Sequence, residues 1–67
     1  MSSGLVIFYD AERGYGYLRL LGTLEEFHFR SRNLADGPVK KGDTVTFLLA
    51  LSKQGYYADE VRASPLL

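Results

Sequence analysis

The amino-acid sequence predicts an all-β domain in which five short strands close into a small antiparallel barrel. The chain has 67 residues, which suits one domain spanning residues 1–67. Its apolar segments are short, rich in β-branched and aromatic residues, and separated by turn residues. None of them shows a helical period. Closure into a barrel would leave so small a sheet without long exposed edges.

Each predicted strand is bounded by residues that favour turns. Glycine, proline and aspartate cluster at Asp36-Gly37-Pro38 and at Lys41-Gly42-Asp43, and Lys53-Gln54-Gly55 is a third break. A single helical turn is expected at residues 31–35. In chain order, the strands are predicted at residues 5–9, 15–21, 26–31, 44–51 and 56–62.

Side-chain alternation along the strands separates a predicted core from a predicted outer face. Successive side chains of a strand point to opposite faces of the sheet. The expected core consists of Leu18, Leu20, Phe27, Phe29, Val45, Phe47, Leu49, Ala58 and Val61. The outer face of the second and third strands then carries Tyr15, Tyr17, Arg19, Glu26, His28 and Arg30. Simple alternation places Phe8 on the inner face, beside Val6.

Composition narrows the classes of function. The chain has no cysteine and one histidine, so we expect no disulfide, no metal site and no cofactor. No apolar run approaches the roughly 20 residues of a membrane span, and the start does not resemble a signal peptide. We therefore expect a soluble cytoplasmic protein. The formal net charge is zero, so only a local basic patch could attract nucleic acid.

Enzymatic activity is not expected. The pairs Glu25-Glu26 and Asp59-Glu60 could in principle transfer protons, but nothing in the sequence supplies a nucleophile or a metal beside them. Solubility and protection of strand edges explain these carboxylates more simply.

Four short motifs occur in order along nearly the whole chain. They read GLVIFYDAERGYGYL at 4–18, EFHFR at 26–30, KGDTVTF at 41–47 and QGYYADEV at 54–61. Together they resemble the motifs of bacterial cold-shock proteins, with the first two similar to that family's ribonucleoprotein motifs. The resemblance implies a five-stranded barrel of the oligonucleotide-binding type that binds single-stranded RNA or DNA. An SH3-like barrel is an alternative that fits the ordered motifs less well.

The resemblance also implies which side chains meet the strand. Tyr15 and Tyr17 match two positions where the family stacks bases on Phe. Phe8 stands where the family has Trp, and its outward placement follows from the resemblance alone. His28 replaces a stacking Phe, and Arg30 replaces a His. The candidate interface is Phe8, Tyr15, Tyr17, Arg19, His28, Arg30 and Tyr57.

Two departures from the family lower the expected affinity. Ile7 replaces a Lys and Gln54 replaces a basic residue, so binding should be weak and should depend only shallowly on salt. The expected function is that of a monomeric single-stranded RNA- or DNA-binding protein, acting as an RNA chaperone or a regulator of expression. The alternative, suggested by the zero net charge, is a protein-interaction barrel that has lost its nucleic-acid ligand.

Overall fold

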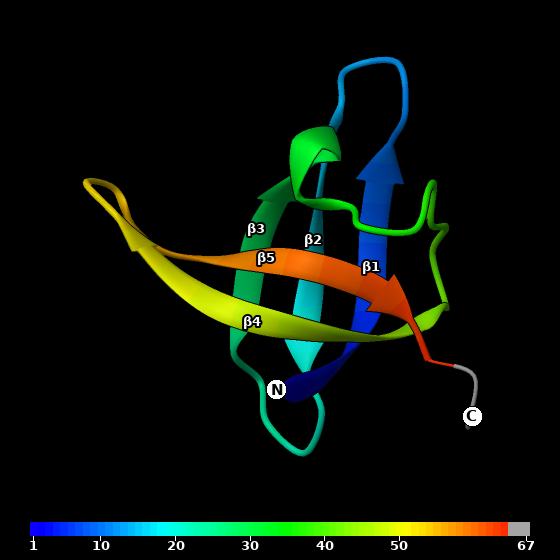
Figure 1. Cartoon of the computed structure of the whole chain (residues 1–67). Helices are drawn as coiled ribbons and strands as arrows, with labels where there is room; N and C mark the ends of the chain where they lie inside the picture. The colour runs from blue at the N-terminus through cyan, green and yellow to red at the C-terminus, as the bar shows by residue number, and fades with distance from the viewer. Residues whose placement is uncertain (65–67) are drawn as a thin grey trace.

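A computed structural model describes residues 1–64 and shows five strands closed into a barrel (Figure 1). The all-β prediction is therefore confirmed; residues 65–67 of the predicted domain lie outside the described part. A 3₁₀ turn, η1 (Ser31–Asn33), falls within the segment expected to be helical. The strands are β1 (Ser2–Asp10), β2 (Tyr15–Leu20), β3 (Glu26–Arg30), β4 (Thr44–Ser52) and β5 (Gly55–Ala63).

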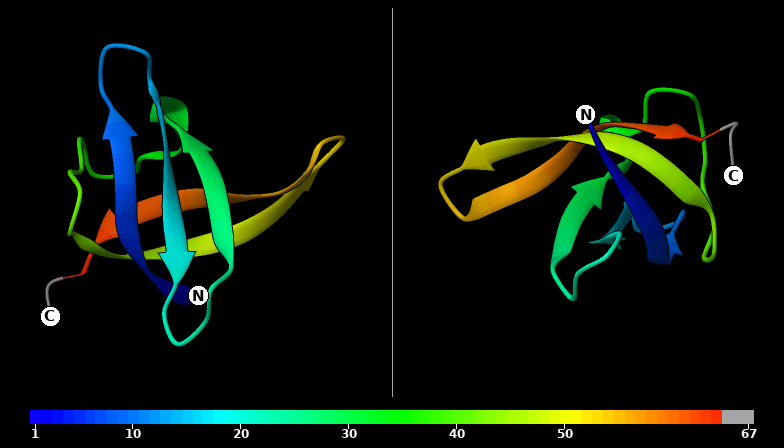
Figure 2. Two further views of the ribbon diagram at one scale, coloured as in Figure 1. Left: turned by 180° about the vertical axis from the view of Figure 1, so that it is seen from behind. Right: turned by 90° about the horizontal axis from the view of Figure 1, so that it is seen from below.

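One strand pair differs from the expected all-antiparallel arrangement. Around the barrel the order is β1-β2-β3-β5-β4, and β4 pairs again with β1 (Figure 2). Strand directions cannot alternate around a closed ring of five, so at least one neighbouring pair must be parallel. That pair is β3 and β5, which meet at His28 and Tyr57. The closure therefore places these two side chains next to each other although they are far apart in the sequence.

The core agrees with the predicted one at most positions. Leu20 and Phe27 are partly buried and pack against it, together with Tyr9, Leu34 and Val39. The fully buried apolar side chains are Val6, Leu18, Phe29, Val45, Phe47, Ala58 and Val61.

No helix within residues 1–64 is long and apolar enough to cross a membrane.

A β-bulge in β1 reverses the side-chain alternation at Ile7. Val6 lies opposite Leu18 in β2, but Phe8 lies opposite Tyr17, so β1 contains one extra residue here. Val6 consequently points into the core, whereas Phe8 points outward and is 43 % exposed. Tyr9 turns inward and stacks on Phe29 with ring centroids 5.7 Å apart. Simple alternation was wrong for Phe8, and the placement implied by the family resemblance agrees with the structure.

Leu49 was expected in the core, and this prediction was wrong, since its side chain is 43 % exposed. The end of β4 and the start of β5 form a hairpin, residues 49–56, that projects beyond the other strands; we call it the arm (Figures 1 and 2). On the arm β5 no longer pairs with β3, whose contact with β5 is at Tyr57. The inner face of β4 is buried at Phe47, whereas Leu49 lies where the hairpin begins to project from the barrel (Figure 1).

A second bulge, in β5, explains why Ala58 and Val61 are both buried although they are three residues apart. Arg62 pairs with Thr46 and Asp59 pairs with Leu48, so two residues of β5 face one residue of β4. Glu60 lies in this bulge with φ of +49°, in the left-handed region that L-residues other than Asn and Asp rarely adopt.

Replacing Glu60 with Asn is expected to raise the free energy of unfolding by up to about 1 kcal/mol, because Asn tolerates the left-handed conformation better. The substitution also removes the ion pair of Glu60 with Arg62, but exposed pairs of this kind contribute about 0–1 kcal/mol. Urea denaturation of both proteins measures the difference. A lower unfolding midpoint for Glu60→Asn would contradict the proposed backbone strain.

Candidate nucleic-acid interface

Four ring-bearing side chains form a row across the outer face of β1, β2, β3 and β5. Phe8 pairs in register with Tyr17, Tyr17 with His28, and His28 with Tyr57. Tyr15 lies beside this row, with its ring centroid 5.7 Å from that of Phe8 and 6.1 Å from that of His28. We call these five residues the aromatic face. The structure thus brings together all five of the predicted ring-bearing site residues.

Within the aromatic face, the rings of Phe8, Tyr15, Tyr17 and His28 contact one another and remain partly open to solvent. Tyr17 contacts His28 at a centroid distance of 5.6 Å and an interplanar angle of 64°, and it contacts Tyr15 nearly edge-on at 87°. Such tilted contacts are favourable for aromatic pairs. Phe8 and Tyr17 are 43 % and 39 % exposed, respectively. Flat apolar surface of this kind, fixed by its neighbours, can stack against nucleic-acid bases.

Gly16 allows β1 and β2 to come close enough for this arrangement. It lies on the inner side of β2, between Tyr15 and Tyr17, and it is buried. A Cβ atom at this position would lie 2.9 Å from Cζ of Phe29 and would overlap the carbonyl oxygen of Phe8. The absence of a side chain therefore lets the bulged part of β1 place Phe8 beside the tyrosines.

Arg19 and Arg30 both point outward as predicted, but their charges have different surroundings. Arg19 pairs in register with Glu26, and its Nη2 donates a hydrogen bond of 2.8 Å to Oε2 of that carboxylate. Its charge is thereby balanced at the end of the sheet away from Tyr15. Arg30 pairs in register with Tyr15 and has no carboxylate oxygen within 4.0 Å among the residues that the structure describes. Of the two, Arg30 is better placed to contact a phosphate.

Arg32 is a further candidate that the sequence reasoning missed. It lies in η1 and likewise has no ion-pair partner within residues 1–64. The pattern Arg30-Ser31-Arg32 was visible in the sequence, where it begins at the last residue of the motif EFHFR. The position of Arg32 relative to the aromatic face depends on how η1 folds back against β5, and no local sequence pattern predicts this contact.

The surroundings of the histidine in the aromatic face favour its uncharged form. Its partial burial, and secondly the positive charge of Arg30, lower the pKa of His28 below the ordinary value of 6.5. His28 therefore contributes an aromatic ring to this surface at pH 7, and the arginines contribute the positive charge.

Acidification is expected to strengthen binding of a single-stranded oligonucleotide between about pH 7 and about pH 5.5. A bound phosphate backbone would favour protonated His28 and raise its pKa, so binding would take up a proton. The folded state itself should become slightly less stable over this range, because the pKa of His28 is lower in the folded than in the unfolded chain.

Fluorescence anisotropy with a labelled thymidine heptanucleotide measures this pH dependence, since thymidine does not titrate in the range. His28 is the only histidine of the chain, so a His28→Phe variant is the control and should give a nearly flat profile. If the affinity of the unsubstituted protein and that of the His28→Phe variant changed equally with pH, the pH dependence would arise from a group other than His28.

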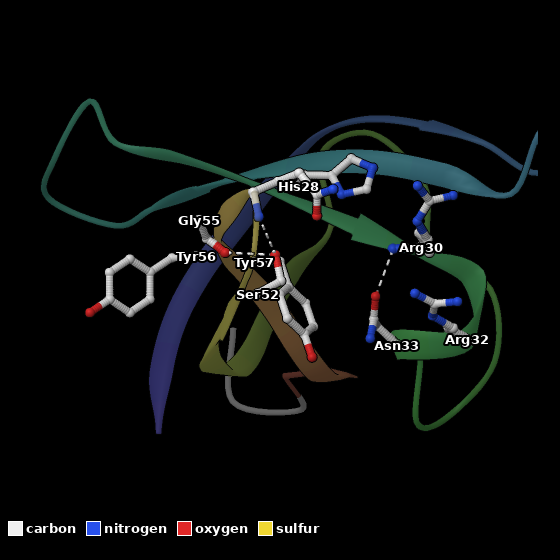
Figure 3. A pocket seen from close by; sticks show the side chains of 9 residues that line it. His28, Arg30, Arg32, Asn33, Ser52, Gly55, Tyr56 and Tyr57 are labelled. Carbon is white, nitrogen blue, oxygen red and sulfur yellow. Dashed lines mark hydrogen bonds between the residues drawn. The ribbon is translucent and has the colours of Figure 1, made fainter.

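A pocket of about 460 Å³ opens where the row of rings reaches β5 (Figure 3). Its lining includes His28, Tyr57, Arg30, Arg32 and the turn between β4 and β5. In Figure 3 the two arginine side chains lie at one end of the pocket, and the ring of Tyr56 points away at the other end.

Buried Asn33 holds the arginine-bearing segment against β5. Its side chain is 8 % exposed, and its Oδ1 accepts a 2.9 Å hydrogen bond from the backbone N–H of Arg30. Its Nδ2 donates a 3.0 Å bond to the carboxylate of Asp59 in β5. Both ends of the amide are therefore satisfied, and the backbone that carries Arg30 and Arg32 is fixed relative to the strand that carries Tyr57.

Comparison with protein families and with curated proteins identifies no relative. No protein-family model matches the chain, and no curated protein is significantly similar to it. Membership of the cold-shock family therefore stays a prediction. Within residues 1–64, no group of three or more acidic or histidine side chains is placed to hold a metal ion.

Proposed function

We propose that this protein binds single-stranded nucleic acid across the aromatic face. The observation that supports the proposal is a row of ring-bearing residues that crosses four strands: Phe8, Tyr17, His28 and Tyr57. The row ends beside Arg30 and Arg32, which have no carboxylate partner within residues 1–64. Successive bases would stack on the rings, and each stacked base contributes about 1–3 kcal/mol in such sites. Because every base has a π face, this mode of binding discriminates little between sequences.

Arg30 and Arg32 would supply the phosphate contacts in this proposal. Each phosphate neutralised on a single strand adds about −0.7 to the slope of log K against log salt, so two contacts give about −1.4. Ile7 and Gln54 supply no charge, which agrees with a slope this shallow. The stacking contacts, which do not depend on salt in this way, would provide most of the affinity.

Amide chemical shifts during titration with a pyrimidine heptanucleotide test the proposal. Shifts are expected for residues of the aromatic face and for Arg30, and a duplex of the same sequence should cause much smaller ones because its bases are already stacked. Parallel titrations with thymidine and uridine strands determine whether DNA or RNA binds more tightly. No shifts at Tyr15, Tyr17 and His28 at millimolar strand would overturn the proposal.

The proposed cellular role follows from weak, sequence-tolerant binding. We propose a cytoplasmic RNA chaperone or regulator of expression that acts as a monomer, as the resemblance to cold-shock proteins implies. Stacking on exposed rings keeps a strand open without the need for a cofactor or a chemical step.

A second candidate function, protein interaction, is favoured by the arm. Leu51 and Tyr56 are cross-strand neighbours near its tip and are 69 % and 62 % exposed, and Leu49 shares their face. Exposed apolar residues grouped in this way occur at protein interfaces. If this is the function, self-association or partner binding should require Leu51 and should not respond to oligonucleotide. Sedimentation velocity of the protein and a Leu51→Ser variant, with and without heptanucleotide, separates the two candidates.

A further inference from the structure

The pocket beside the aromatic face carries an unbalanced positive charge. Arg30 and Arg32 both line it, and neither has a carboxylate partner within residues 1–64. None of the described residues that line the pocket is acidic. The lining also includes Gln54, whose side-chain amide can donate hydrogen bonds. The lining is therefore suited to an anion.

Charge matching favours one kind of phosphate. An internal phosphodiester of a strand carries one negative charge, whereas a phosphomonoester carries about −1.5 to −2 at pH 7 and has three oxygens that accept hydrogen bonds. Guanidinium groups present planar pairs of donors that match phosphate oxygens. Two arginines that have no carboxylate partner in the described part of the chain therefore complement a monoester better than a diester.

The pocket has room for more than the phosphate. Its volume of about 460 Å³ lies in the range of small-molecule sites, which is about 300–1,000 Å³. His28 and Tyr57 belong to both the pocket and the aromatic face, so a base attached to the phosphate would meet a ring. The hydrogen bonds of Asn33 hold the backbone of Arg30 in position before any ligand arrives.

We propose that this pocket binds the terminal phosphomonoester of a nucleotide, and that a strand with a phosphorylated end binds with that end between Arg30 and Arg32. The part of this proposal that concerns a strand rests on the proposed function, because the remaining bases would occupy the aromatic face. The protein would then distinguish phosphorylated from unphosphorylated ends in addition to binding single strands generally.

The test compares the Kd values of three thymidine heptanucleotides, which carry a 5′ phosphate, a 3′ phosphate, or a hydroxyl at both ends. One phosphorylated form should bind about tenfold more tightly than the hydroxyl form, since charge-assisted hydrogen bonds to phosphate are strong. In Arg32→Gln this ratio should fall to about one. In the matched control Lys41→Gln, which removes an exposed charge that does not line the pocket, the ratio should persist.

The outcomes separate this proposal from the proposed function. Equal Kd values for the three strands would overturn the phosphate pocket and leave strand binding intact. If the preference for a phosphorylated strand were also lost in the Lys41→Gln variant, the preference would reflect general electrostatic attraction. That result would also overturn the phosphate pocket. If no strand binds, the proposed function fails, and a titration with thymidine 5′-monophosphate alone then tests the pocket. Amide chemical-shift changes at Arg32 and Tyr57 that disappear in the Arg32→Gln variant would support the phosphate pocket. The absence of such changes in the unsubstituted protein would overturn it.

Discussion

Replacing Tyr17 with Leu is expected to weaken binding of a single-stranded heptanucleotide by about 5- to 150-fold. Tyr17 occupies the middle of the aromatic face, in register with both Phe8 and His28. Loss of its ring removes one stacking contact of about 1–3 kcal/mol, and each 1.4 kcal/mol corresponds to a factor of about ten in Kd. Leucine keeps an apolar side chain at the position, so the change isolates the aromatic ring. Fluorescence anisotropy measures the two affinities.

The matched control for this experiment is Tyr17→Phe, which keeps the ring and loses the hydroxyl. It should bind within a few-fold of the unsubstituted protein. Tyr17 is 39 % exposed, so neither change should disturb the core, and thermal unfolding of each variant checks this. Equal affinity of the Leu and Phe variants would show that bases do not stack on this ring, and would remove the main support for the proposed function.

Replacing Gly16 with Ala is expected to cost about 1–3 kcal/mol of stability, or more if the backbone cannot adjust. The added methyl group would meet the carbonyl oxygen of Phe8, which is backbone and cannot rotate away, as well as the ring of Phe29. In a domain of this size each kcal/mol lowers Tm by about 4–8 °C. Circular dichroism during heating measures the shift.

Gly22→Ala is the control for Gly16→Ala. Gly22 has a φ of +81°, but within residues 1–64 no atom beyond its two chain neighbours lies within 4 Å of the position its Cβ would take. Its substitution therefore carries only the conformational cost of about 1–2 kcal/mol and none of the steric overlap. The Gly16 variant should also separate Phe8 from the tyrosines and weaken strand binding, whereas the Gly22 variant should not. An unchanged Tm for Gly16→Ala would show that β1 and β2 tolerate a wider spacing.

Residues of β2 and β3 were predicted correctly because their pattern is local. The pleat of a strand alternates side chains with a period of two, and neither of these strands contains an extra residue. Leu18 and Phe29 therefore lie in the core, and Tyr15, Tyr17 and His28 lie outside. The number of strands and the closed barrel followed from the same local signals and from the short length of the chain.

Phe8 and Leu49 could not be placed by alternation. The bulge at Ile7 shifts every later residue of β1 to the other face, and it depends on pairing with β2, including the close approach that Gly16 permits. Leu49 continues the inner face of β4, but whether an inner face is buried depends on what lies across from it. The arm projects beyond the other strands, and Leu49 at its base is therefore left partly exposed (Figure 1).

The sequence by itself determined an all-β barrel, its approximate strands, and a face of outward-pointing rings on β2 and β3, because these features depend on residue type and on a period of two. Only the tertiary structure decided that Phe8 and Tyr57 extend this face into a row across four strands. It also decided that the charge of Arg19 is balanced by Glu26. Finally, it decided that Arg30 and Arg32 line the same pocket. These relations join residues from different strands, and they arise when the barrel closes.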